Sequence, residues 1–232
     1  NFGYILRHNI EPNGGGKRVN QFSLAYDVYF SGKGNGWASI ANLDNKGDGD
    51  VFWRKGDGGL GQGGGGYEPE DPEVKVTAEQ WHRIILSFNL ENGTYTKYLN
   101  GVYHSKQPNG GLDGRQSMGT SVWLFNDNDG ENGEVFVGSV AVYNREISAD
   151  EAGLLGGASE GGLPLFIPEP VVIAPVAPEI SFKRDENGIV VVFEGKLQTS
   201  SNPAGPWKDI EASSPASFEA GEKHLFFRSR TP

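Results

Sequence analysis

The sequence contains no cysteine among its 232 residues, only one methionine and only four histidines. The absence of cysteine excludes structural disulfides, thiolate metal sites and cysteine nucleophiles. The histidines, His8, His82, His104 and His224, are far apart, and none has the H-x-H or H-E-x-x-H spacing of a zinc site. Thiol chemistry and histidine-bound zinc are therefore excluded as the basis of a function.

Long apolar runs are also missing. No run approaches the roughly 20 apolar residues that are needed to span a bilayer, so we expect no membrane insertion. The chain begins at Asn1 without a signal peptide, which is what we expect of a trimmed or processed fragment.

Positive charge is scarce in the first part of the chain. Residues 1–178 hold 13 Lys and Arg against 22 Asp and Glu, a net charge of −9, whereas residues 179–232 hold 7 against 8. An acidic surface repels phosphate backbones, so nucleic acid is not an expected partner. Solubility and cation binding explain the acidity equally well.

The composition changes sharply at a proline-rich stretch. Of the 35 glycines, 31 precede residues 163–178. A chain of this length has room for one medium domain and a smaller companion. The sequence therefore predicts a first domain at 1–162, a linker at 163–178 and a small β module at 179–232.

The first domain has the patterns of an all-β fold with one short helix. Apolar residues alternate along Phe22 to Phe30, which predicts a strand with one buried face. Val135 to Tyr143 predicts another strand, with a bulge or close backbone approach at Gly138. Ser148 to Glu151 has the form of a capping box, which begins a helix that Gly156 can end.

Three stretches carry a resemblance to a known family: VGSVAVYNREISADEAGLLGG (137–157), WHRIILSFNLENGTYTKYLNG (81–101) and FSLAYDVYF (22–30). They resemble the laminin-G-like domains of bacterial proteins in the concanavalin A-like superfamily. The resemblance implies an antiparallel jelly-roll β-sandwich, a secreted or cell-surface location and a calcium ion near the rim. Members of the family bind sugars or proteins.

The C-terminal module carries a second resemblance. The string LQTSSNPAGPWKDIEASSPASF, followed by HLFFR, resembles the short fibronectin-III-like β modules that end many exported bacterial proteins. Trp207 and Phe226 or Phe227 are expected to form its core.

Two acidic, glycine-rich turns predict a calcium site. They are DNKGDGD (44–50) and DNDGENGE (127–134), which offer carboxylates, amides and main-chain carbonyls but no histidine. Such oxygen-only ligands in flexible turns suit Ca²⁺, whereas Mg²⁺ demands a stricter octahedron. The alternative is two solvated turns without metal. The candidate ligands are Asp127, Asp129, Asp48, Asp50, Glu131 and Glu134.

Exposed aromatic residues predict the ligand site, which we expect to take a polysaccharide or other glycan. Aromatic rings stack on sugar faces, while amides and carboxylates bond the hydroxyl groups. The candidates are Trp53, Tyr67, Trp37 and Tyr103, of which the first two flank the glycine-rich stretch 55–66. Trp81 is expected to be buried. The alternative is an adhesion or self-assembly module that binds a protein partner or a sister subunit.

The sequence predicts that the protein is not an enzyme. No strand has the E-x-D-x-x-E spacing of paired glycosidase carboxylates, and no G-x-S-x-G nucleophile motif is present. The acids of Glu68 to Glu73 are separated by prolines and belong to a loop. A polysaccharide hydrolase or lyase is the second alternative.

Overall fold

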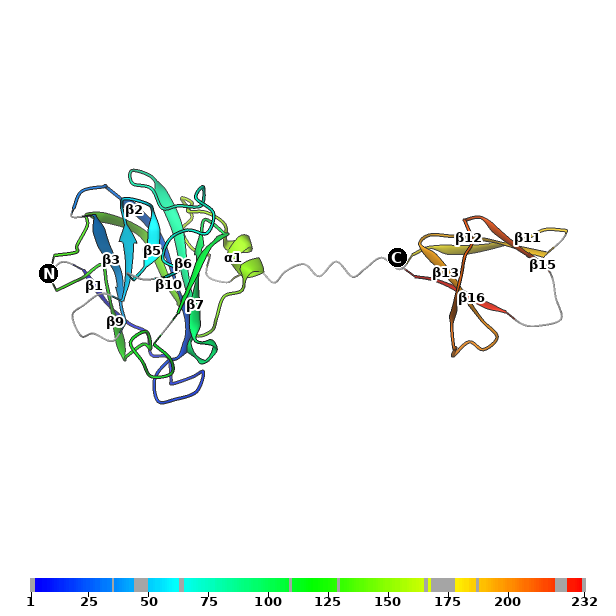
Figure 1. Cartoon of the computed structure of the whole chain (residues 1–232), viewed down its shortest axis with the longest axis horizontal. Helices are drawn as coiled ribbons and strands as arrows, with labels where there is room; N and C mark the ends of the chain where they lie inside the picture. Colours follow the sequence, from blue (N-terminus) through cyan, green and yellow to red (C-terminus); the bar gives the residue numbers. More distant parts are fainter. Residues whose placement is uncertain are drawn as a thin grey trace. The chain divides into compact units, whose positions relative to one another are not determined.

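The computed structural model describes residues 3–34, 36–43, 50–62, 65–108, 110–128, 130–164, 167, 178–186, 188–219 and 225–230. The chain forms two compact units, Asn1–Pro170 and Val171–Pro232 (Figure 1). Most of the predicted linker at 163–178 lies outside the described residues.

The larger unit consists of two five-stranded antiparallel sheets that pack face to face (Figure 1). The first sheet has the order β1-β9-β3-β4-β5, with β1 Tyr4–Arg7, β9 Ser121–Leu124, β3 Trp37–Asn42, β4 Val51–Arg54 and β5 Gly59–Gly61. The second has the order β10-β2-β6-β7-β8, with β10 Val135–Tyr143, β2 Gln21–Phe30, β6 Trp81–Asn89, β7 Thr94–Leu99 and β8 Val102–Pro108. A single-turn 3₁₀ helix, η1 Leu90–Asn92, joins β6 to β7. The predicted all-β sandwich is confirmed.

The core between the sheets follows the predicted alternation of β2. Phe22, Leu24, Tyr26, Val28 and Phe30 are all fully buried in one apolar cluster. Strands with a side-chain period of two direct one complete set of residues to one face, which explains why all five share this core. The opposite residues of β2 consequently lie on the outer face of the second sheet.

That outer face is built from cross-strand pairs whose character changes along the strands. From one end of β2 and β6 to the other, the pairs are Ser23 with Ser87, Ala25 with Ile85, Asp27 with Arg83, and Tyr29 with Trp81. The face therefore passes from small and apolar pairs, through an ion pair, to an aromatic pair.

The apolar half of the outer face is covered by the helix α1 Ala149–Leu155. The predicted capping box is confirmed, because the Ser148 side chain accepts from the Glu151 N–H while the Glu151 side chain accepts from the Ser148 N–H. Ala152 and Leu155 pack against Ala25, Ile85 and Tyr98 in a second apolar cluster.

A buried ion pair lies beside the covered half. The Arg83 guanidinium donates to both carboxylate oxygens of Asp27, at 2.7 and 2.8 Å, and both side chains are 3% exposed. Arg83 also donates to the carbonyls of Leu155 and Gly162, the latter at 2.8 Å. Ser139 completes the network by donating to Asp27 at 2.8 Å. The pair thereby fixes the end of α1 and the segment after it to the sheet.

A second buried cation ties the glycine-rich stretch to β7. The Lys97 ammonium group is fully buried and donates to the carbonyls of Leu60 and Gly66, at 2.8 and 2.7 Å. Burial lowers the pKa of Lys97 to about 7, because the charged form loses its hydration.

The smaller unit has two three-stranded antiparallel sheets (Figure 1). The strands are β11 Ile180–Arg184, β12 Gly188–Phe193 and β15 Ala216–Glu219 in one sheet, and β14 Lys208–Ile210, β13 Lys196–Ser200 and β16 Phe226–Arg230 in the other. Its buried core consists of Val191, Phe193, Leu197 and Ala216, with Phe227 packed against it.

The prediction that Trp207 is a core residue is wrong. Its ring lies under the Arg228 guanidinium at 4.5 Å, outside the buried cluster. Arg228 is on the opposite face of β16 from the core residue Phe227, since successive side chains alternate.

We expect the loss of either member of the buried ion pair to destabilise the larger unit. Asp27→Ala or Arg83→Ala leaves an uncompensated buried charge, which lowers the free energy of unfolding by about 3–5 kcal/mol. Urea denaturation measures this loss, and Glu91→Ala on the exposed surface serves as the control. A loss below 1 kcal/mol in both variants would contradict a structural role for the pair.

We also expect stability to rise between pH 7 and pH 9 because of Lys97. Lysine in the unfolded chain has a pKa of about 10.4, whereas the folded value is about 7. In this range the unfolded chain holds a proton that the folded chain has released, so raising the pH favours folding. Melting temperatures measured across this range should show the slope, and Lys97→Met should flatten it while the exposed Lys75→Met keeps it. Equal slopes in both variants would refute the assignment.

Candidate functional site

Three aromatic side chains form a row across the uncovered half of the second sheet. Phe136 on β10 pairs with Tyr29 on β2, which pairs with Trp81 on β6. Neighbouring ring centroids are 5.8 Å apart in both pairs. Phe136 is 52% exposed and Trp81 48%. We call these three residues the aromatic row.

Trp81 and its neighbour reverse the sequence-based expectation. Trp81 was predicted to be buried, yet it is 48% exposed, and it is the next residue, His82, that is buried at 3% exposed. The register explains the reversal, because Trp81 lies opposite Tyr29 on the outer face and the next residue must point inward. The outward position of Tyr29 in the alternating pattern of β2 was the sequence signal for this site.

A bulge at Gly138 makes room for the indole of Trp81. The register of β10 against β2 shifts between Val137 and Ser139, as the strand pattern predicted. A Cβ atom at Gly138 would lie 3.2 Å from Cζ3 of Trp81, which is closer than ordinary contact. Glycine therefore allows the indole to extend across β2 toward β10.

The indole forms one wall of a pocket of about 420 Å³, which we call the Trp81 pocket. The segment 158–162, which follows α1, forms another wall. The lining residues are Asp27, Trp81, Gly138, Ala158, Ser159, Glu160 and Gly162. Because Arg83 holds the carbonyl of Gly162, the buried ion pair positions this wall.

The polar groups of the pocket differ in whether they already have hydrogen-bond or ion-pair partners. Both oxygens of Asp27 accept from Arg83, and one also accepts from Ser139. The ion pair is therefore neutral as a unit. Glu160 is exposed and has no ion pair within the described part of the chain, so its carboxylate is the one uncompensated charge of the lining. An aromatic face beside hydrogen-bonding groups can hold a ligand with one apolar side and several hydroxyl groups.

Of the ligand-binding residues predicted from the sequence, Trp53 does not fit. It is 3% exposed, and its ring stacks on Phe30 with centroids 4.3 Å apart. Its indole N–H donates to the Val76 carbonyl at 3.1 Å. The prediction that Trp53 is exposed is wrong, because β4 directs Trp53 and Val51 into the core.

The structure brings Trp37 and Tyr67 together on the first sheet. Their ring centroids are 6.0 Å apart, and the Arg54 guanidinium lies 4.4 Å from the ring of Tyr67 and 5.5 Å from that of Trp37. Arg54 also forms ion pairs with Asp57 and Glu68. The cation therefore covers one face of the Tyr67 ring.

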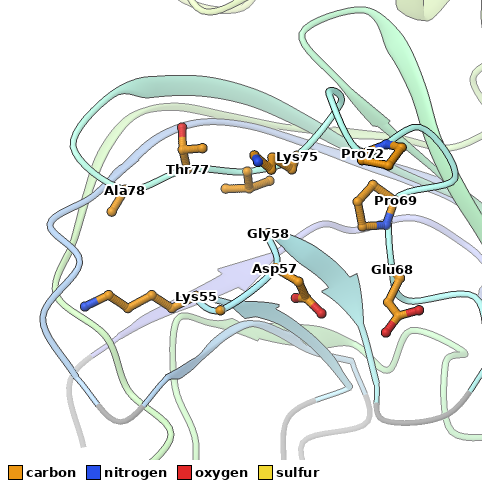
Figure 2. Close-up of a pocket in the computed structure, with 11 residues that line it drawn as sticks. Lys55, Asp57, Gly58, Glu68, Pro69, Pro72, Lys75, Thr77 and Ala78 are labelled. Carbon is orange, nitrogen blue, oxygen red and sulfur yellow. The ribbon is translucent and has the colours of Figure 1, made fainter.

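A shallow cleft of about 490 Å³ lies next to this cluster (Figure 2). Figure 2 shows it between the turn at Lys55–Gly58 and the loop that carries Pro69, Pro72 and Lys75. Its carboxylates, Asp57 and Glu68, are the partners of Arg54.

Tyr103 lies on β8, away from both aromatic clusters. Its hydroxyl donates to Oε1 of Glu70, and its ring contacts Tyr98 edge-on at 6.4 Å. Burial and the bond to Glu70 raise the pKa of Tyr103 to about 12. These contacts anchor the loop at Glu70 to β8.

Four of the six predicted metal ligands lie within the described residues. The other two, Asp48 and Asp129, lie outside them. Asp50 is fully buried, with Oδ1 accepting from Arg115 and Oδ2 from the Leu43 N–H, both at 2.6 Å. Glu134 is exposed and pairs with Lys33 at 3.0 Å. Across the described ranges, no three acidic or histidine side chains converge as a metal site would require.

The second acidic turn nevertheless has unusual buried oxygens. Asp127 is fully buried, and its Oδ2 accepts from the Glu131 N–H at 3.3 Å. The amide oxygens of Asn126 and Asn132 are buried without a hydrogen-bond partner. Ser39 fixes both arms of the turn, donating to the carbonyls of Asn126 and Glu131 at 2.9 and 2.8 Å.

Comparisons with known proteins give only distant likenesses. No protein-family model and no curated protein matches the sequence. A solved structure of Trypanosoma rangeli sialidase is similar at 16% identity and a TM-score of 0.45, covering 59% of this chain and 22% of the sialidase. The botulinum neurotoxin serotype D binding domain is similar at 15% identity and a TM-score of 0.40, covering 83% and 55%.

These matches correct one prediction. The sequence predicted that the protein is not an enzyme, yet the similar solved structures include sialidases, which are enzymes. The assignment as a non-catalytic protein is therefore withdrawn. The chain spans about a fifth of the length of these sialidases.

Proposed function

We propose that the larger unit binds carbohydrate at the aromatic row and the Trp81 pocket. The observation that carries this proposal is the half-exposed indole of Trp81, which forms one wall of the pocket and continues the row of Tyr29 and Phe136. Neighbouring strands are about 4.8 Å apart, so three strands present an apolar strip about 10 Å long.

The proposed binding mode follows from the chemistry of the pocket. The apolar C–H face of a pyranose ring would lie on the indole, which removes apolar surface from water on both sides. Its hydroxyl groups would reach the Glu160 carboxylate and the Ser159 hydroxyl, which line the same pocket. The second and third rings would support further sugar units along the strip.

We further propose that this unit is a laminin-G-like domain of an exported protein. The strand β10, the bulge at Gly138 and the capped helix α1 follow one another in the order that the resemblance implies. Within the described part of the chain, no helix is long and apolar enough to cross a membrane.

A protein partner is the second candidate function, and the edge strand β1 favours it. β1 lies at the edge of the first sheet, where Tyr4 is 62% and Ile5 68% exposed. An exposed edge presents unpaired main-chain groups that can pair with a strand of another chain.

We also propose that the second acidic turn binds calcium. The buried, unpartnered amide oxygens of Asn126 and Asn132 support this, because burying a polar atom without a partner costs free energy that a bound cation would offset. The Asn132 amide N–H group donates to the Asp127 carbonyl at 3.4 Å, which fixes the orientation of its oxygen. Together with the Asp127 carboxylate, these are the hard oxygen ligands that Ca²⁺ prefers.

We expect Trp81→Ala to weaken carbohydrate binding about tenfold, since the indole supplies the main apolar contact of the pocket. A glycan array identifies the ligand of the wild type, and titration calorimetry measures the change in affinity. Tyr4→Ala removes an exposed aromatic residue from the other sheet and should bind as the wild type does. If the wild type binds glycans and Trp81→Ala binds them equally well, the pocket is not the site.

For calcium, we expect removal of divalent ions with a chelator to lower the melting temperature by several degrees, because a ligand that binds only the folded state stabilises it. Restoring calcium should reverse the change in the wild type but not in Asp127→Asn. Glu134→Gln, which removes an exposed acid of the same turn, should respond to calcium like the wild type. A wild-type melting curve that is independent of calcium would exclude the site.

A further inference from the structure

The charges around the Trp81 pocket restrict which sugars it can take, and this inference rests on the proposed function. Glu160 is the one lining carboxylate without an ion pair among the described residues. The other carboxylate, Asp27, is neutralised by Arg83. Arg83 is itself buried and paired with Asp27, and it also donates to the carbonyls of Leu155 and Gly162, so its charge is already compensated.

The lining of the pocket offers no balancing charge. Among the described residues no cation lies over a ring of the aromatic row, and Glu160 and Trp81 line the same pocket. Lys33, in the turn that follows β2, pairs with Glu134 at 3.0 Å. An anionic ligand in the pocket would therefore meet the Glu160 carboxylate, and none of the described residues that line the pocket is a lysine or an arginine.

We propose that Glu160 makes this pocket selective for uncharged sugars over sugars that carry a carboxylate. A hydroxyl group can donate a hydrogen bond to Glu160, whereas a uronate or sialate carboxylate brings a second negative charge to the same wall. In this partly solvated pocket the repulsion corresponds to about a threefold to tenfold loss of affinity for each carboxylate held near Glu160.

The selectivity can be measured on an array that carries neutral glycans beside their acidic counterparts. Two suitable pairs are mannohexaose with hexamannuronate, and methyl-esterified with free hexagalacturonate. We expect the neutral member of a bound pair to bind about threefold to tenfold more tightly at low salt. The difference should shrink in 1 M salt, where the screening length falls to about 3 Å.

The variants Glu160→Gln and Glu160→Lys assign the effect to this residue. Glu160→Gln removes the negative charge, so the ratio of the affinity for the acidic glycan to that for its neutral counterpart should rise about threefold to tenfold, whatever the variant's own affinity for the neutral member. Glu160→Lys should favour the acidic counterpart further. Glu91→Gln, at the far end of β6, removes one exposed acid about 30 Å away and should leave the ratio unchanged.

The outcomes separate this inference from the proposed function. An acidic glycan that binds the wild type as tightly as its neutral counterpart would overturn the selectivity and leave carbohydrate binding intact. An unchanged ratio in both Glu160 variants would also overturn it. If no glycan on the array binds, carbohydrate binding is refuted, and the selectivity is refuted with it.

Discussion

The buried ion pair of Asp27 and Arg83 is the constraint on which the outer face of the second sheet depends. Two charges withdrawn from water are tolerated only when each is paired and its remaining hydrogen-bonding groups are satisfied. Arg83 meets this condition by reaching beyond Asp27 to the carbonyls of Leu155 and Gly162. The same bonds therefore neutralise a buried charge and fasten the helix and the segment after it.

The ion pair also divides this face into two halves with different roles. On one side the helix α1 covers Ala25 and Ile85, so that half belongs to the core. On the other side nothing among the described residues covers the aromatic pair of Tyr29 and Trp81 to the same degree. Exposed aromatic side chains that gather on one sheet face are uncommon on a soluble surface, which is why the proposed binding site is placed on this half.

On the first sheet, aromatic side chains are already in contact with a cation. Arg54 joins Trp37 and Tyr67 and is balanced by two carboxylates, so its charge and much of the aromatic surface are already engaged. Among the described residues no cation lies over the ring of Trp81, and Glu160 in its pocket has no ion pair. This contrast is the reason for placing the proposed site at Trp81 rather than at Trp37 and Tyr67.

The sequence by itself determined the elements whose signals are local. The alternation of β2, the bulge at Gly138 and the capping box at Ser148 depend on residues close together in the chain, and all three were predicted. Only the tertiary structure decided which tryptophans are exposed, because that depends on register between distant strands. Trp53 and Trp81 both stand in apolar strand contexts, yet pairing places the first in the core and the second on the surface. The Trp81 pocket likewise depends on Asp27, Gly138 and Glu160 lining the same cavity. Their spacing along the chain does not predict that they lie close together.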